Sequence, residues 1–287
     1  MNHTDYPALY QSASALSKRK QDVFYENFYT HMALLALASA ISIANSTCAA
    51  VAVVQALVLL GALACATYLF MARPDRDWYA SRAVAESIKT ITWRYISRAE
   101  PFNNSDDSDR TGFKRKLKAI IEQNQDIAGL FTSNLASVQI TDEMEMRRSK
   151  QMTARMDFYK SKRIIEQQNW YASKASQNEK SVKKFFMLLL STITIAIALS
   201  LLKILYPSAP YWPTDFFVTC AAGLLSWIQA KRFQDLSISY ALAAHEISLI
   251  REDLINVQTE ANFSAFVSDA ENAFSREHTQ WAARKDH

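Results

Sequence analysis

The chain has 287 residues, and its four glycines and six prolines are fewer than an average sequence of this length would carry. Rossmann, P-loop and β-rich folds need glycine at their turns, so this composition argues against them and for long helices. The 32 Lys and Arg residues exceed the 28 Asp and Glu residues by four, an excess too small to indicate a nucleic-acid-binding protein.

Two long stretches, residues 27–72 and 185–202, contain no Asp, Glu, Lys or Arg. Uncharged, mostly apolar runs of about 18 residues or more are typical of membrane spans. The sequence therefore predicts a membrane protein that also carries a large polar helical part. Its three cysteines, Cys48, Cys65 and Cys220, lie in or beside these stretches without metal-ligand spacing and are predicted to pack as small apolar residues.

The first apolar stretch is too long for a single span. Residues 32–71 would form a helix of about 60 Å, roughly twice the thickness of the hydrocarbon core of a bilayer. The stretch must fold back, and the polar residues 45–47 (Asn-Ser-Thr) are predicted to form the turn. This gives a hairpin of two spans, at about 32–46 and 49–71.

A polar helix is predicted to follow this hairpin at about 75–98. Pro74 can begin a helix, and no further Gly or Pro occurs until Glu100-Pro101 ends it. Residues 103–109 are predicted to be a polar linker. Beyond the linker, a short basic amphipathic helix is predicted from four apolar residues that share one face: Phe113, Leu117, Ile120 and Ile121.

The second half is predicted to begin with Thr141 as the N-cap of a long helix that runs to Lys184 and on into a third span at about 185–205. Three prolines between residues 206 and 213 then interrupt the chain before a fourth span at about 214–230. The stretch from 231 to about 284 contains neither Gly nor Pro and is predicted to be another long polar helix.

The distribution of Lys and Arg residues sets the orientation. All of them except Lys203 lie outside the predicted spans and their short connections, and the connections at 45–48 and 206–214 contain none. Cytoplasmic segments carry the excess of Lys and Arg, so both connections are predicted to face outward. Both termini and segment 73–184 are predicted to lie in the cytoplasm, and the chain in a cell inner membrane.

The predicted fold is therefore all-α: a four-span helical membrane protein built from two transmembrane hairpins, with long cytoplasmic helices that form a bundle. Each half repeats the same order of elements, which indicates an old duplication, with Glu86 and Glu246 as corresponding residues. The predicted domains are a first two-span unit at 1–102, a linker with the short amphipathic helix at 103–141, and a second two-span unit at 142–287.

One face of the predicted helix 75–98 combines charged and aromatic residues. At about 100° per residue, Trp78, Arg82, Glu86, Lys89 and Trp93 lie in one narrow stripe. A solvated ladder of ion pairs is one interpretation. Two tryptophans beside the ladder favour another, a buried or intersubunit polar network for assembly or signal input, because large rings are seldom left in water in pairs. A ligand-binding pocket is a third.

A second stripe lies in the third predicted span. Thr192, Ala196 and Ser200 are spaced by four residues, which is typical of close helix packing and also fits a water-accessible pore lining. Lys203 continues the stripe toward the outer surface, where it can snorkel out of the hydrocarbon core or pair with Asp215 as a polar outer mouth.

Signatures of catalysis are missing from the sequence. None of the motifs GxxxxGK[ST], GxGxxG, GxSxG and HExxH occurs, and the five histidines are scattered along the chain. We therefore predict no enzyme activity and no catalytic, cofactor or metal site.

Residues 75–95 (DRDWYASRAVAESIKTITWRY) and 98–102 (RAEPF) resemble the SLATT family, the two-span effector domains associated with SMODS nucleotidyltransferases and SLOG nucleotide sensors in bacterial conflict systems. The segment at about 142–285 is similar to a second copy by its architecture. The residues that carry this second similarity are Tyr159, Arg163, Trp170, Tyr171, Tyr240 and Glu246.

The resemblance implies a membrane effector of a bacterial defence system, which forms a pore or disrupts the membrane when a nucleotidyltransferase or nucleotide-sensor partner triggers it. We expect a homo-oligomer in the lipid bilayer, because four spans in one chain are too few to enclose a wide channel. Two alternatives stay open: a non-conducting scaffold that docks a soluble sensor, and a small channel or transporter.

Overall fold

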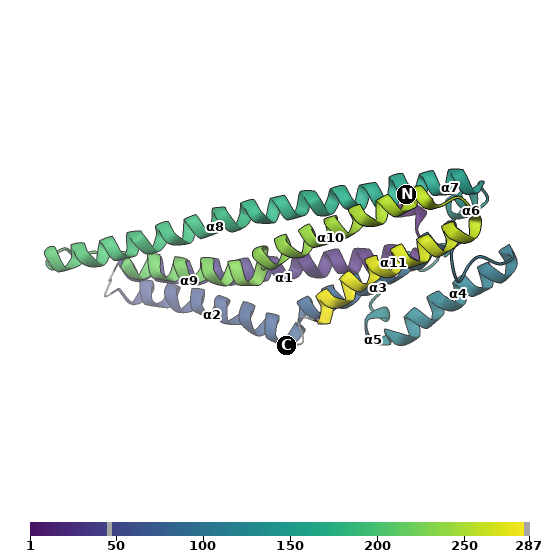
Figure 1. Cartoon of the computed structure of the whole chain (residues 1–287). Coiled ribbons are helices and arrows are strands. Elements are labelled where there is room, and N and C mark those ends of the chain that lie inside the picture. The colour runs from purple at the N-terminus through teal and green to yellow at the C-terminus, as the bar shows by residue number, and fades with distance from the viewer. Residues whose placement is uncertain (45–47, 284–287) are drawn as a thin grey trace. The chain divides into compact units, whose positions relative to one another are not determined.

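The computed structural model describes residues 1–44 and 48–283, and every regular element within these ranges is helical (Figure 1). The all-α class is therefore confirmed. In chain order the longer helices are α1 (Ala8–Ile43), α2 (Ala49–Ala72), α3 (Pro74–Ile96), α4 (Asp106–Gln123), α8 (Glu166–Leu205), α9 (Thr214–Lys231), α10 (Phe233–Asp253) and α11 (Glu260–Ala283). The shorter ones are α5 (Gln125–Ala128), α6 (Asp142–Arg148), α7 (Met152–Tyr159) and a π-helical segment at Lys160–Ile165.

The chain divides into two compact units. One, here called the polar unit, comprises Met1–Asp22, Pro74–Tyr171 and Leu242–His287. The other, here called the hairpin unit, comprises Val23–Arg73 and Ala172–Ala241.

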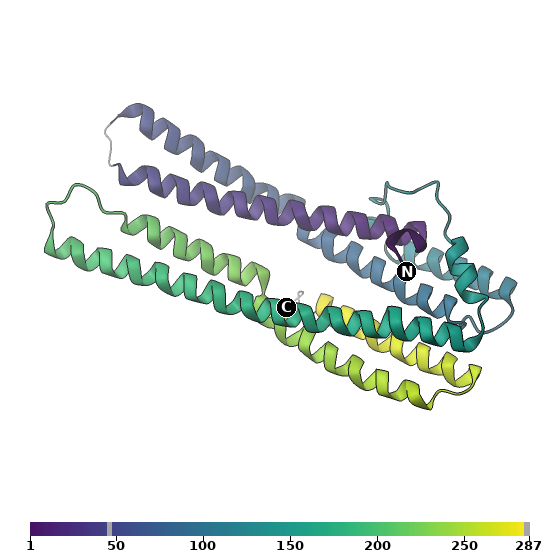
Figure 2. The ribbon, with the colours of Figure 1, turned by 90° about the horizontal axis from the view of Figure 1, so that it is seen from above.

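The hairpin unit consists of two antiparallel helix pairs, α1 with α2 and α8 with α9 (Figure 2). Its buried side chains are small, as at Ala38, Ala62, Ala196 and Ala221, whereas many of its large apolar side chains point outward. The packing is close enough that a methyl group added at Gly61 would lie 3.3 Å from Leu34. Small residues inside and large apolar residues outside are the arrangement expected of helices in lipid.

Two helical stretches, Ala49–Ile96 and Met152–Leu205, are long and apolar enough to cross a membrane, judged by length and composition. They contain the predicted spans 49–71 and 185–205. The turn predicted at residues 45–47 lies outside the described residues.

In each half of the chain, a single residue separates the second apolar helix of the hairpin from the polar helix that follows it. Arg73, between α2 and α3, and Arg232, between α9 and α10, both adopt the left-handed conformation, with φ of 39° and 49°. Pro74 then occupies the first position of α3, where a missing N–H costs no hydrogen bond. The polar helix predicted at 75–98 corresponds to α3.

The long helix predicted from Thr141 to Lys184 is interrupted, so this prediction was wrong. Thr141 does act as an N-cap, and its hydroxyl accepts a hydrogen bond from the Met144 N–H at 3.3 Å, but the helix it begins is the short α6. The chain is extended at Gln151 before α7 starts. The Lys150 carbonyl accepts a hydrogen bond from Arg155 Nε at 3.0 Å, so a side chain satisfies a carbonyl group at the break.

The single helix predicted from residue 231 to about 284 is also wrong, because α10 and α11 are separate helices. After a short turn at Leu254–Asn256, Val257 is extended. The Thr259 hydroxyl accepts a hydrogen bond from the Asn262 N–H at 3.2 Å, which caps the N-terminus of α11. A break therefore forms without Gly or Pro.

The core of the polar unit surrounds α3, which packs against α4, α5, α6 and α11. Ile88, Trp93 and Tyr95 of α3 are almost completely buried in this core. Residues 103–109, predicted to be a linker, are only partly one: α4 already begins at Asp106, and the Asp109 side chain is buried.

Candidate functional site

The charged and aromatic stripe of α3 lies mostly inside the polar unit. Trp78 and Trp93 are buried, while Arg82, Glu86 and Lys89 are partly buried. Lys89 Nζ lies 3.5 Å from Glu86 Oε2. The stripe is therefore not an exposed ladder of ion pairs, although an ion pair does form within it.

Four of the five stripe residues line a cavity of about 410 Å³, and Trp78 is the one that does not. This volume is within the range of about 300–1,000 Å³ that is common for ligand sites. The lining side chains include four basic and two acidic ones together with several aromatic rings. The lining residues are Met1, His3, Tyr6, Tyr10, Arg82, Glu86, Lys89, Trp93, Lys162, Arg163, Glu166, Gln167 and Trp170.

The N-terminal segment is fixed to this cavity by aromatic residues. Trp93 Nε1 donates a hydrogen bond to the Tyr6 hydroxyl at 3.0 Å, and the rings of Tyr6 and Tyr10 lie 4.4 Å apart. Burial, followed by the nearby negative charge of Glu86, raises the pKa of Tyr10 to about 12. Its phenol group therefore stays protonated at neutral pH and remains a hydrogen-bond donor.

A buried ion pair holds Arg163, one of the residues that line the cavity. Arg163 donates from Nε to Glu271 Oε1 at 2.8 Å and from Nη2 to Glu271 Oε2 at 2.7 Å, a bidentate geometry. The Tyr159 hydroxyl donates to the same Oε1 at 2.9 Å. Both charged side chains are almost inaccessible to solvent, so loss of either one would leave the other charge buried without a partner.

Sequence reasoning singled out Tyr159 and Arg163 but missed Glu271. A signal was available, because Glu271 lies on the face of α11 that also carries Phe263, Val267 and Phe274. A carboxylate on an apolar helix face needs a buried partner. Glu246, the expected counterpart of Glu86, is instead exposed on α10.

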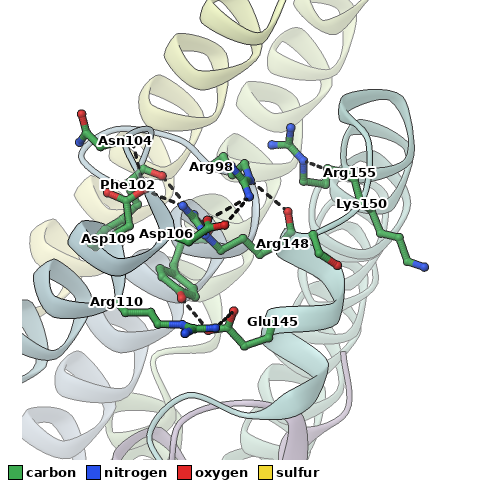
Figure 3. A network of polar contacts seen from close by, with 12 residues as sticks. Arg98, Phe102, Asn104, Asp106, Asp109, Arg110, Glu145, Arg148, Lys150 and Arg155 are labelled. Carbon is green, nitrogen blue, oxygen red and sulfur yellow. Dashed lines mark hydrogen bonds and ion pairs between the residues drawn. The ribbon is translucent and has the colours of Figure 1, made fainter.

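A second buried arginine joins α6 to α3 and α4 (Figure 3). Arg148 is 1% exposed and donates from Nη2 to Asp109 Oδ2 at 2.6 Å and from Nε to Asp106 Oδ1 at 3.0 Å. Its Nη1 donates to the backbone carbonyl groups of Tyr95 at 2.6 Å and Phe102 at 3.1 Å. One guanidinium group thus fixes the end of α3 and the start of α4.

The edge of this network is closed by Glu145, which accepts from the Tyr95 hydroxyl at 2.8 Å and from two nitrogens of Arg110, both at 3.0 Å (Figure 3). The hydrogen bond from Arg110 is the main reason that the pKa of Glu145 lies below its ordinary value. Asp109 belongs to the same network and was missed because residues 103–109 were interpreted as a linker. It lies four residues before Phe113 and shares the buried face of α4.

The residues predicted to line a pore or form its mouth differ in their exposure to solvent. Thr192 and Ala196 are buried inside the hairpin unit, which fits helix packing. Ser200, Lys203 and Asp215 are exposed, and no ion pair joins Lys203 to Asp215 in the part of the chain that the structure describes. Among the described residues, no group of three or more His, Cys, Asp or Glu side chains gathers to hold a metal ion.

We expect Arg148→Ala to lower the free energy of unfolding of the protein by about 3–5 kcal/mol, because Asp109 then stays buried without its cation. Thermal unfolding in detergent, followed by circular dichroism, measures this loss. Lys118→Ala removes an exposed ion pair with Glu122 and is the matched control, with an expected change below about 1 kcal/mol. The double variant Arg148→Met with Asp109→Leu should recover part of the lost free energy of unfolding. A melting temperature of Arg148→Ala equal to that of the wild type would contradict the role of this network.

The low pKa of Glu145 predicts a pH dependence of stability. A carboxyl group whose pKa is lower in the folded state than its ordinary value of 4.5 stabilises the fold above that pH, and this contribution is lost as the pH falls through the folded-state pKa. Melting temperatures measured from about pH 6 to pH 3 should therefore fall less steeply for Glu145→Gln than for the wild type. Glu122→Gln removes an exposed charge from α4 and should keep the wild-type slope.

Comparison with known families gives two matches in tandem. The family described as SMODS and SLOG-associating 2TM effector domain 3 matches residues 7–156, which is more than half of the chain. The family described as SMODS and SLOG-associating 2TM effector domain 1 matches residues 159–281. Neither a curated protein nor a solved structure matches significantly. The Arg148 network lies within the first match and the Arg163–Glu271 pair within the second, and the chain belongs to the SLATT family of two-transmembrane effector domains, with two copies in tandem.

Proposed function

We propose that the chain is a bacterial defence effector whose hairpin unit inserts into the inner membrane as four spans, and whose copies assemble and permeabilise that membrane on a signal. The observation that carries this proposal is the outward-facing apolar surface of the hairpin unit. Leu57 and Leu63 on α2 are each 61% exposed, and Ile204 and Leu205 on α8 are 74% and 70% exposed. In water this surface would be costly, and a bilayer removes the cost.

Four spans are favoured because each strongly apolar helix has an antiparallel partner. The end of α1 accompanies α2, and α9 accompanies α8 (Figure 2). The connection between α8 and α9 contains no Lys or Arg, whereas Lys183, Lys184 and Lys231 lie at the opposite ends of these helices. The positive-inside rule then favours both termini and the polar unit in the cytoplasm.

Assembly is part of the proposal because one copy supplies too few spans to enclose a pore. The cavity beside the α3 stripe is the favoured place for signal input, since it combines charged groups with aromatic rings and lies in the polar unit. We propose that the signal comes from a nucleotidyltransferase or nucleotide-sensor partner; in support, the family's description names an association with SMODS and SLOG. If the chain is instead a non-conducting scaffold, exchanging its spans for unrelated apolar helices should preserve its activity.

Dye release from vesicles tests permeabilisation without knowledge of the trigger, because a high protein-to-lipid ratio drives assembly by mass action. We expect leakage that rises steeply with this ratio, and a severalfold smaller leakage for Glu86→Gln, which removes the carboxylate that pairs with Lys89. Asp107→Asn makes the same charge change at an exposed position of α4 and should leak like the wild type. Vesicles that stay tight at every ratio would contradict pore formation.

Topology is tested with single cysteines in a cysteine-free background and a membrane-impermeant maleimide. In spheroplasts, Ser208→Cys in the α8–α9 connection should be labelled, and Ser173→Cys on the polar part of α8 should be labelled only after lysis. Labelling of Ser173→Cys in intact spheroplasts, or release of the protein by a carbonate wash, would refute the proposed orientation or the membrane insertion, respectively.

A further inference from the structure

The hairpin unit contains an apolar groove of about 530 Å³ between α1, α8 and α9. The groove exists because small residues stand where larger ones would fill the space. They include Ala33 and Ala36 on α1 and Cys220 and Gly223 on α9. Phe217 and Trp227 also line it, ten residues apart on α9, so the groove is about 15 Å long.

Two lysines lie at one end of this groove. Lys231 Nζ is 3.2 Å from the ring centre of Tyr25 and 4.8 Å from that of Trp227, a lining residue. Lys184 Nζ is 5.8 Å from the ring centre of Phe185, which lines the groove from α8. Within the described residues, no ion pair joins either ammonium group to a carboxylate, so both charges are available to a ligand.

An apolar groove with two cations at one end is complementary to a molecule with a hydrocarbon chain and an anionic head. We propose that the groove binds one anionic phospholipid, with an acyl chain between α1, α8 and α9 and the phosphate group at Lys184 and Lys231. Tyr25 and Trp227 place an aromatic belt at the level of the headgroup, which is where such rings gather in membrane proteins. This inference rests on the proposed membrane insertion.

The two lysines at one end of the groove favour an anionic lipid over an apolar helix of a second copy. The charges agree with this choice, because anionic lipids of the cytoplasmic leaflet attract basic residues and the lysine end of the groove is the proposed cytoplasmic end.

Native mass spectrometry of the full-length protein in detergent, titrated with phosphatidylglycerol or phosphatidylcholine, tests the site. We expect one retained phosphatidylglycerol per chain and weaker retention of phosphatidylcholine. Lys231→Gln and Lys184→Gln should each weaken phosphatidylglycerol binding about fivefold, the effect of removing one lysine from an anionic lipid surface. Lys183→Gln is the matched control, because this neighbouring lysine is exposed and pairs with Glu179 at 2.6 Å, and it should bind like the wild type.

A variant that fills the groove with a larger side chain distinguishes binding of the acyl chain in the groove from attraction of the headgroup to the lysines. Ala33 is exposed and lines the groove, so Ala33→Phe should remove the tightly retained lipid of either headgroup while the protein stays folded. Equal retention of both lipids by all variants would overturn the proposal. An Ala33→Phe variant that changes the copy number of the complex but not its lipid count would also overturn it, and would identify the groove as a contact between copies.

Flotation of the wild type with phosphatidylcholine vesicles distinguishes a failure of membrane insertion from a failure of the lipid site. A protein that fails to float contradicts the proposed membrane insertion and the lipid site with it. A protein that floats but shows no preference for phosphatidylglycerol contradicts the lipid site alone.

Discussion

A guanidinium group that leaves water must be surrounded by acceptors, and three buried arginines, Arg148, Arg155 and Arg163, impose this condition on the polar unit. Arg148 gathers the end of α3 and the start of α4 around four hydrogen bonds, and Arg163 binds Glu271 on α11 through two. These contacts act between segments that are far apart in the sequence. Each pair offsets the cost of burying its charges only when both members are in place, so the polar helices are fixed by a few exact contacts as well as by apolar burial.

Within the residues that the structure describes, the hairpin unit is held together without such polar contacts. Its helices contain few groups that need a partner beyond the backbone, and small residues such as Ala62 and Ala196 let them approach closely. Where the small residues accumulate on α1 and α9, the same property leaves a groove beside Gly223. The two units thus show two ways to hold helices together, directional polar contacts in one and close contact of small side chains in the other.

Much of this architecture could be predicted from the sequence, and the reasons are physical. The absence of charge over residues 27–72 and 185–202 indicates apolar helices directly, and the scarcity of glycine indicates that the rest is helical. The breaks near Lys150 and Val257 could not be predicted from composition, because a side-chain acceptor or donor replaces Gly or Pro there, as Thr259 does for α11.

The candidate site was predictable in part. The spacing of the stripe predicts Trp78, Arg82, Glu86, Lys89 and Trp93 on one face of α3, and all of them except Trp78 line one cavity. The partners from other elements, above all Glu271, are brought near by the tertiary fold, and no local pattern pairs them with Arg163. An acidic residue on an apolar face signals a buried partner without saying which one.

The left-handed residues Arg73 and Arg232 have a mechanical consequence. At each of these residues the regular series of helical hydrogen bonds is interrupted. A rotation of the apolar helix about its own axis therefore need not rotate the helix that follows. A change in tilt can be absorbed by the φ and ψ angles of one residue, while the interior of either helix stays rigid. In the proposed four-span arrangement, the arginine side chain at each of these positions also carries a charge that is costly to move into hydrocarbon, which limits movement of this part of the chain along the bilayer normal.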